Sequence, residues 1–284
     1  MPSALATRVT TAALLLVAVL AALFLLPSAG WGVIVLLAIT VGAREWASLI
    51  GLAGGAAIGL PAIVFALGAL LLLGATPVRG DGWPPPTVAV VCGLATIFWI
   101  LVGIPSVLYD WQPDPRWLRA LAAMVVLLGA FVAVVELQAR SPWLVLAAMA
   151  IVWIADTAAF FAGRAFGRRK LAPRISPGKS WEGVFGGIAA VVIYALVLVP
   201  LASRAGVEVV TDATSIALWI VFIVAITALS VVGDLHESLL KRRAGVKDSG
   251  TLLPGHGGVL DRTDALLAAM PPVALATLAF VGRA

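Results

Sequence analysis

Charge and cysteine are both scarce in this chain of 284 residues. Only 12% of its residues are charged and 62% are hydrophobic, whereas a soluble domain carries roughly 25% charged residues. Its sole cysteine, Cys92, excludes an intramolecular disulfide and any metal site built from several cysteines. With so little charge, water cannot be the main solvent around the fold, and the composition indicates a membrane protein.

Long apolar runs fill most of the sequence. A helix needs about 20 apolar residues to cross a bilayer core of roughly 30 Å. Such stretches cover residues 9–27, 31–50, 56–75, 87–106, 118–137, 143–162, 183–202, 214–234 and 259–281. The sequence therefore predicts an all-α, polytopic integral membrane protein with about nine transmembrane helices.

The chain divides into two membrane regions. Residues 1–140 hold about five predicted spans, and residues 141–284 hold the other spans and two polar loops, 163–182 and 235–258. The first apolar run ends at Pro27-Ser28-Ala29 and resembles a signal peptide. We expect it to be retained, because the later helices need it to keep their orientation.

Basic residues predict the orientation. A net charge of +5 would suggest nucleic acid as the partner of a soluble protein, but in a membrane protein it is typical of basic cytoplasmic loops. Placing the N-terminus in the cytoplasm puts 15 of the 19 Lys and Arg residues on that side. We therefore expect no nucleic-acid partner, a C-terminus outside, and both polar loops facing the cytoplasm, where nucleotides are found.

Ionisable residues gather in the C-terminal region. An ionisable group at membrane depth costs several kcal/mol, so each one is a candidate for function. The acidic members are Asp156, Glu182, Asp234, Glu237, Asp248, Asp261 and Asp264, and the histidines are His236 and His256. This distribution predicts that residues 141–284 form the catalytic region.

Helical spacing arranges several of these groups on one face. If residues 231–243 are helical, positions i, i+3, i+4, i+7 and i+8 share a face. These positions are Asp234, Glu237, Ser238, Lys241 and Arg242. Oxygen ligands then lie at one end of the face and cations at the other. The segment Gly255-His256-Gly257-Gly258 carries little side chain, so its backbone can approach a ligand closely and offer amide donors.

This chemistry suits a hard cation and phosphate. Carboxylates and a hydroxyl without cysteine favour Mg²⁺ or Mn²⁺ over zinc, and carboxylates beside Lys and Arg suit phosphate transfer, because the metal and the cations neutralise developing charge. Gly178-Lys179-Ser180 invites comparison with a P-loop, but that motif needs a glycine where Pro173 stands. The residues alone thus indicate cation-assisted phosphate chemistry at the membrane surface.

Other charged residues have simpler interpretations. Asp156 and Glu182 can pair with neighbouring arginines between helices, and the basic residues between 164 and 174 can serve only orientation or bind anionic headgroups. Arg44 and Glu45 stand at a span end, where an interfacial pair is the default interpretation and a role near the site is the alternative.

A long motif covers the polar region. It has the form S-x-x-K-R, four residues, K-D-x-G, then L-P-G-H-G-G-x-x-D-R-x-D. It is matched by Ser238, Lys241-Arg242, Lys247-Asp248, Gly250, Leu253 to Gly258, Asp261-Arg262 and Asp264. With this motif the chain resembles the phosphatidate cytidylyltransferases, also called CDP-diacylglycerol synthases, and the stretch from Ile175 to Gly183 is similar to a second region of that family. Ala265 departs from the family, many members of which have serine there.

The resemblance implies a reaction in which CTP and phosphatidic acid give CDP-diacylglycerol and pyrophosphate. It implies a metal centre on Asp234 and Asp261 that holds Mg²⁺, with K⁺ as a second cation that can share the centre. It also implies a multi-pass homodimer in a bacterial plasma membrane, in contact with membrane lipids.

The expected roles follow from this reaction. The lipid phosphate attacks the α-phosphorus of CTP, and pyrophosphate leaves in line. The catalytic candidates are Ser238, Lys241, Arg242, Lys247, Asp248, His256 and Asp264. The candidates for substrate binding are Arg164, Ser176, Lys179, Gly257, Gly258 and Arg262. We expect the cations to bind phosphate, and His256 to bond a phosphate oxygen or protonate pyrophosphate.

Two other functions stay open at this stage. A cation-coupled transporter would also place charge within the membrane, but here the charges lie toward one side and no inverted repeat is visible. A CTP-dependent polyprenol or phytol kinase would phosphorylate a hydroxyl, which calls for a general base, and His256 would have to serve. The long motif favours the phosphatidate enzyme.

Overall fold

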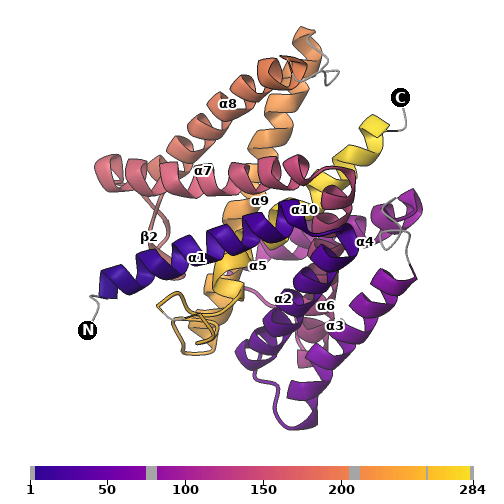
Figure 1. Ribbon diagram of the computed structural model, residues 1–284. Helices are drawn as coiled ribbons and strands as arrows, with labels where there is room; N and C mark the ends of the chain where they lie inside the picture. The colour runs from indigo at the N-terminus through magenta and orange to yellow at the C-terminus, as the bar shows by residue number, and fades with distance from the viewer. Residues whose placement is uncertain (1–3, 75–81, 205–211, 254, 282–284) are drawn as a thin grey trace.

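The computed structural model describes residues 4–74, 82–204, 212–253 and 255–281. Its helices are α1 (Ala4–Leu25), α2 (Ser28–Leu49), α3 (Gly55–Leu73), α4 (Pro85–Phe98), α5 (Ile104–Tyr109), α6 (Arg116–Arg140), α7 (Pro142–Phe166), α8 (Trp181–Arg204), α9 (Ala213–Arg243) and α10 (Leu260–Val281). A π-helical turn, η2 (Trp99–Gly103), joins α4 to α5. Each predicted span overlaps one helix or the joined pair, and the all-α prediction is confirmed (Figure 1).

Seven of these segments are long and apolar enough to cross a membrane. They are α2, α3, the joined segment Pro85–Tyr109, α6, α7, α8 and α9. α1 adds a shorter apolar stretch, Thr10–Leu25, and α10 carries charged residues in its first turns. The chain is therefore a multi-pass membrane protein, and the predicted number of nine includes α1 and α10.

The two polar connections are more ordered than predicted. Within the loop predicted at 163–182, β1 (Lys170–Ala172) and β2 (Ser176–Ser180) pair antiparallel. This hairpin was not predicted, because its strands are short and β2 contains proline and glycine, which are depleted in strands. In the loop predicted at 235–258, α9 continues to Arg243, so the irregular chain covers residues 244–259. We call this segment the 244–259 loop.

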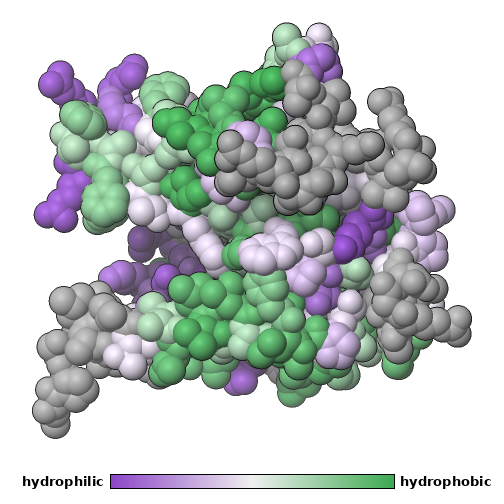
Figure 2. Space-filling view, turned by 45° about the horizontal axis from the view of Figure 1, so that its top comes forward, coloured by the Kyte–Doolittle hydropathy of each residue, from purple (hydrophilic) through white to green (hydrophobic). Residues whose placement is uncertain are grey.

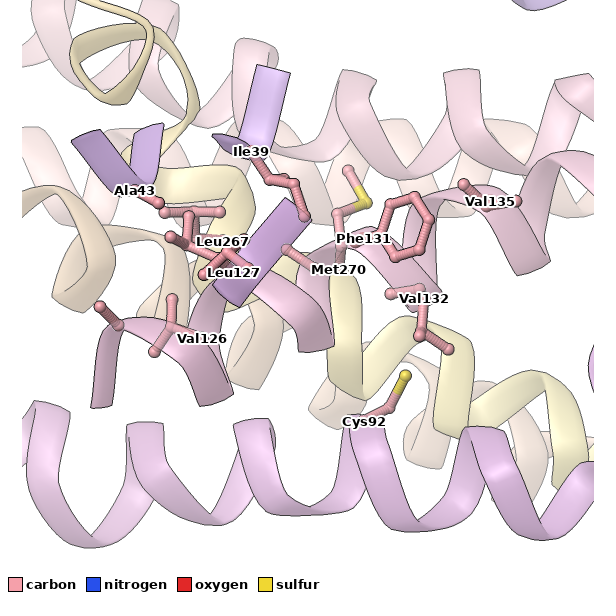
Figure 3. Packing of buried hydrophobic residues seen from close by; sticks show 14 of the residues in the cluster. Ile39, Ala43, Cys92, Val126, Leu127, Phe131, Val132, Val135, Leu267 and Met270 are labelled. Atoms are coloured by element: carbon pink, nitrogen blue, oxygen red, sulfur yellow. The ribbon is translucent and has the colours of Figure 1, made fainter. Parts of the chain in front are cut away.

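α6 lies within the larger hydrophobic core. Its Leu127, Phe131 and Val132 are fully buried, and Figure 3 shows them among side chains of α2, α4 and α10. Small residues allow the helices to approach closely: a Cβ added at Gly129 would lie 2.3 Å from the Cβ of Ala95 in α4. This core fixes α2 and α10 against each other through α6.

A second core joins α7, α8 and α9, which form the upper part of the molecule in Figure 1. Ile151 of α7, Val191 of α8 and Ile223 of α9 are buried there. α9 also packs along α10, so it connects the two cores. Its polar end, next to the 244–259 loop, lies where the two parts meet.

Apolar side chains cover much of the outer surface. Large exposed hydrophobic residues occur on most of the helices, and Figure 2 shows them as broad green areas. Between two such areas, the same view shows a recess that contains hydrophilic residues. An apolar exterior is expected of a chain that is surrounded by lipid, and a recess with hydrophilic residues within it is a candidate for function.

Candidate active site

Lys241 joins α9 to α10. Its Nζ lies 2.6 Å from Oε2 of Glu237 on the same helix and 2.6 Å from Oδ1 of Asp261 on α10. All three side chains are largely buried, which strengthens their electrostatic attraction. Because α9 runs unbroken to Arg243, the predicted helical face is confirmed, and it brings Lys241 to the start of α10.

Asp261 also organises the 244–259 loop. Its Oδ2 accepts hydrogen bonds from the backbone N of Ser249 (2.8 Å), the hydroxyl of Ser249 (2.9 Å) and the backbone N of Gly258 (2.8 Å). Gly257, with φ of +81°, passes so close that an added Cβ would lie 2.5 Å from this oxygen. Glycine is therefore required here both for the backbone conformation and for the space.

Asp234 is in contact with a lysine side chain of the hairpin. Lys179 Nζ of β2 lies 2.5 Å from Asp234 Oδ2, and the hydroxyl of Ser238 donates to Asp234 Oδ1 at 3.4 Å. The carboxyls of Asp156 on α7 and Asp264 on α10 lie close enough to Asp234 to interact electrostatically. The structure thus brings Lys179, predicted for substrate binding, to one of the two predicted metal ligands.

The hairpin is held against the helices at both ends. Glu182, in the first turn of α8, accepts hydrogen bonds from the backbone N of Arg168 (3.0 Å) and Arg169 (3.2 Å). Arg242 of α9 donates from Nε to the carbonyl of Ile175 at 3.2 Å. Arg242, predicted as catalytic, therefore holds the hairpin against α9. Glu182 pairs with Arg169, as its simpler interpretation proposed.

A polar cavity of about 540 Å³ opens beside Asp261. The 244–259 loop and α10 line it with Lys247, Asp248, Gly250, Thr251, Leu253, Gly255, His256, Gly257 and Arg262. Arg262 Nε donates to the carbonyl of His256 at 3.0 Å, which ties the loop to α10. The volume suits a ligand of nucleotide size, and five predicted site residues meet on its walls.

The remaining predicted residues differ in their contacts with the candidate site. Ser176 is half-buried in β2, Gly258 donates to Asp261, and Asp264 Oδ1 accepts from the backbone N of Ala265 at 2.7 Å. Arg164 is exposed at the end of α7 and does not join the network described above. Pro254 of the long motif lies outside the described residues.

His236 belongs to the packing of α9. Its Nδ1 lies 2.8 Å from the hydroxyl of Ser106, and the side chain is buried. The rings of Trp46, Phe98 and Trp99 surround it at centroid distances of 5.5 to 6.0 Å. It faces away from the carboxylates and takes no part in the candidate site.

For Glu45 the structure favours the alternative of a role near the site over the default of an interfacial pair. Arg44 is exposed, but Glu45 is buried and accepts hydrogen bonds from the 244–259 loop and the start of α10. The two residues therefore do not form an interfacial pair. The signal for Glu45 was an acidic residue in an apolar span. Glu237 was found on the correct face but was given no role, although it shares Lys241 with Asp261.

The acidic groups do not form a closed protein cage. Within residues 4–281, excluding the undescribed segments, no three His, Cys, Asp or Glu side chains gather closely enough to hold a metal by themselves. Asp234 and Asp261 are instead each paired with a lysine. A cation here would need oxygen ligands besides these carboxylates.

Comparison with known proteins gives consistent matches. A sequence model described as the cytidylyltransferase family matches residues 6–280. A phosphatidate cytidylyltransferase of Pseudomonas aeruginosa is 37% identical over 271 residues, which cover 93% of each chain. One from Haemophilus influenzae is 42% identical over 187 residues, 63% of this chain and 62% of the relative. One from Brucella suis is 49% identical over 122 residues, 42% of this chain and 41% of the relative.

Proposed function

We propose that this chain, which belongs to the cytidylyltransferase family, transfers the cytidylyl group of CTP to phosphatidic acid. The products are CDP-diacylglycerol and pyrophosphate. The observation that carries the proposal is a pair of carboxylate–lysine contacts, the half-buried Asp234 with Lys179 and the buried Asp261 with Lys241, together with a polar cavity beside Asp261 at the ends of membrane helices. Such a site can receive a triphosphate on one side and a lipid phosphate on the other.

The lipid phosphate supplies its own nucleophile. One of its oxygens attacks the α-phosphorus of CTP, the new P–O bond forms, and the bond from the α-phosphorus to the bridging oxygen of pyrophosphate breaks. No serine or cysteine nucleophile is needed. We propose that Lys179, Lys241, Arg242 and Lys247 bind the phosphate oxygens and stabilise the charge that shifts to pyrophosphate, and that His256 on the cavity wall donates to it.

The carboxylates fit Mg²⁺ by their chemistry. Asp234, Ser238 and Asp261 offer only oxygen. Each carboxylate already accepts a cationic lysine, whose place a metal ion would take. Magnesium is commonly held by one or two carboxylates together with substrate phosphates, which agrees with the absence of a closed cage among the described residues. We propose that Asp234 and Asp261 hold Mg²⁺, that K⁺ shares the centre, and that Asp248 and Asp264 orient the neighbouring cations. When bound, the metal neutralises charge on the triphosphate.

Removal of the metal tests this assignment. Purified enzyme treated with EDTA should lose its activity, and Mg²⁺ or Mn²⁺ should restore it, because both prefer oxygen ligands. Zn²⁺ at the same concentration should restore less. Full activity in excess EDTA would contradict the proposal.

The proposal also covers the orientation of the chain in the membrane, its oligomeric state and its lipid contacts. We propose that the N-terminus and the candidate site face the cytoplasm of a bacterial cell, that the C-terminus lies outside, and that the chain forms a homodimer. In Figure 1, α1 begins and α10 ends toward opposite sides of the molecule, which is compatible with termini on opposite sides of a membrane. The exposed Arg164, Arg168 and Arg169 lie next to the exposed Phe166 and are suited to anionic membrane lipids.

The reaction itself is tested with purified protein in detergent. CTP, phosphatidic acid and Mg²⁺ should give CDP-diacylglycerol in the lipid phase and an equal amount of pyrophosphate in the aqueous phase. A polyprenol or diacylglycerol, each of which offers only a hydroxyl, should not be modified. Phosphorylation of the hydroxyl lipid with release of CDP would instead identify a kinase, and no nucleotide-dependent change would leave only transport.

A further inference from the structure

Glu45 is a buried carboxylate on α2, a helix that supplies no group to the proposed chemistry. Its side chain is 7% exposed. None of the ion pairs among the described residues involves it. Since a buried charge without partners would be strongly unfavourable, its charge must be stabilised by hydrogen-bond donors.

Those donors come from the start of α10 and from the 244–259 loop. Oε2 accepts from the backbone N of Leu260 (2.8 Å) and the hydroxyl of Ser249 (3.1 Å), and Oε1 accepts from the backbone N of Val259 (3.0 Å). The first amides of a helix have no partner within the helix, and a negative charge there is favoured by the helix dipole. Glu45 therefore caps α10 from another helix, more than 200 residues away.

Two glycines leave room for this carboxylate. A Cβ added at Gly250 would lie 2.6 Å from Glu45 Oε1, and one added at Gly258 would lie 2.5 Å from it. Neither glycine has a positive φ, so the backbone conformation does not require glycine at these positions. What requires it is the close approach of Glu45.

Ser249 extends the contact to the candidate metal ligand. Its hydroxyl lies 3.1 Å from Glu45 Oε2 and 2.9 Å from Asp261 Oδ2, so the two carboxylates share its single proton. Asp261 stands one residue after Leu260, whose backbone N–H donates a hydrogen bond to Glu45. The position of Asp261 thus depends on Glu45 through the helix start and through the serine.

We propose that Glu45 is a positioning residue for cytidylyl transfer. It fixes the 244–259 loop and the first turn of α10. In this way it holds Asp261 and Lys241 in the positions that the reaction needs. The inference rests on the proposed function only for its kinetic consequence. The structural consequence, order in the loop, is measured without substrate.

The test compares Glu45→Ala with the wild-type full chain in detergent. Hydrogen exchange followed by mass spectrometry should show faster exchange in peptides that cover residues 244–262. Turnover at saturating CTP and phosphatidic acid should fall about 100-fold, because small misplacements of reacting groups have effects of this size. Glu45→Gln keeps the shape of the side chain and one acceptor oxygen, and its turnover should fall about 10-fold.

Glu136 provides a matched control. It is also a buried carboxylate that accepts a backbone N–H from a distant segment, that of Trp83 at 2.7 Å, and it pairs with Arg140. Glu136→Gln should leave exchange of the 244–259 loop unchanged and turnover within about twofold. An equal loss in both variants would mean a general effect of buried carboxylates on stability, and it would overturn the proposal.

Gly250→Ala gives an independent variant in case Glu45→Ala does not fold. Its methyl group would displace the carboxylate, so turnover should again fall about 10-fold or more. In the Glu45→Ala background the same change should cost much less, because the clash is gone. Wild-type turnover of Gly250→Ala alone would overturn the proposal. So would additive effects in the double variant, or a folded Glu45→Ala enzyme with wild-type exchange and turnover. Faster loop exchange in Glu45→Ala beside a wild-type protein that makes no CDP-diacylglycerol would contradict the proposed function alone.

Discussion

The β1–β2 hairpin and the 244–259 loop both bring polar groups to the end of α9, but they are held in different ways. The hairpin is stabilised by pairing of its own strands, and most of its cations are exposed. The described residues of the loop include an isolated bridge, Leu253 with Gly257, and the position of the loop depends on the buried carboxylates of Glu45 and Asp261. Substitutions of buried carboxylates should therefore disturb the loop strongly, while most substitutions in the hairpin should be tolerated.

The largest effect is expected for Asp261→Asn. The change removes the charge that Lys241 and the donors of the loop share, and turnover should fall about 10²–10³-fold. The measurement is CDP-diacylglycerol formation at saturating Mg²⁺. Asp114→Asn is the control, since Asp114 pairs with Arg119 but is 85% exposed, and it should stay within about twofold. Near-normal turnover of Asp261→Asn would disprove its assignment.

Lys179→Met tests the cation of the hairpin that contacts the Asp234 carboxylate of the candidate site. Loss of the contact with Asp234, together with a phosphate contact, should lower turnover about 100-fold. Lys170→Met, on the neighbouring strand and exposed, should lower it less than about twofold. If both lysine variants behaved alike, the hairpin would act only through its net charge, and the distinction between its residues would be lost.

Ser249→Ala should have an intermediate effect. The variant loses the hydroxyl between Glu45 and Asp261 but keeps the backbone donor to Asp261. A hydrogen bond to a charged group contributes about 1.5–3 kcal/mol, so turnover should fall about 10-fold or somewhat more. Ser141→Ala, which removes the cap of α7, is the control and should leave the rate at saturating substrate unchanged. Wild-type turnover of Ser249→Ala would argue against coupling between the carboxylates of Glu45 and Asp261.

The smallest effect is expected for Arg169→Gln. Its side chain is 72% exposed, and its ion pair with Glu182 is therefore screened by solvent. Because the strand pairing and the backbone donors to Glu182 remain, turnover in the same assay should change by less than about twofold. A loss greater than about 10-fold would show that the exposed cations of the hairpin contribute directly to binding of substrate.

Contacts between neighbours in a helix could be predicted from the sequence. The spacing of Glu237 and Lys241, and of Asp234 and Ser238, predicts one face because residues four apart are adjacent on a helix, and both pairs are in contact. The spans were predictable for the same reason, since hydrophobic length is a local property.

Contacts between distant segments could not be predicted in this way. Glu45 meets partners 204 to 215 residues later in the chain, and the sequence indicates only that a charge in an apolar span needs a partner. The hairpin escaped prediction because short strands with proline and glycine carry no alternating pattern. The long motif placed Asp261 in the site, but its three hydrogen bonds to the loop depend on tertiary packing.

Transfer of label from CTP tests the central claim most directly. Two batches of CTP, one radioactive at the α-phosphate and one at the γ-phosphate, are incubated separately with purified protein, phosphatidic acid and Mg²⁺, and the lipids are extracted. Cytidylyl transfer predicts label in the lipid from the α-labelled nucleotide only. Label in the lipid from the γ-labelled nucleotide, or from neither, would contradict the account.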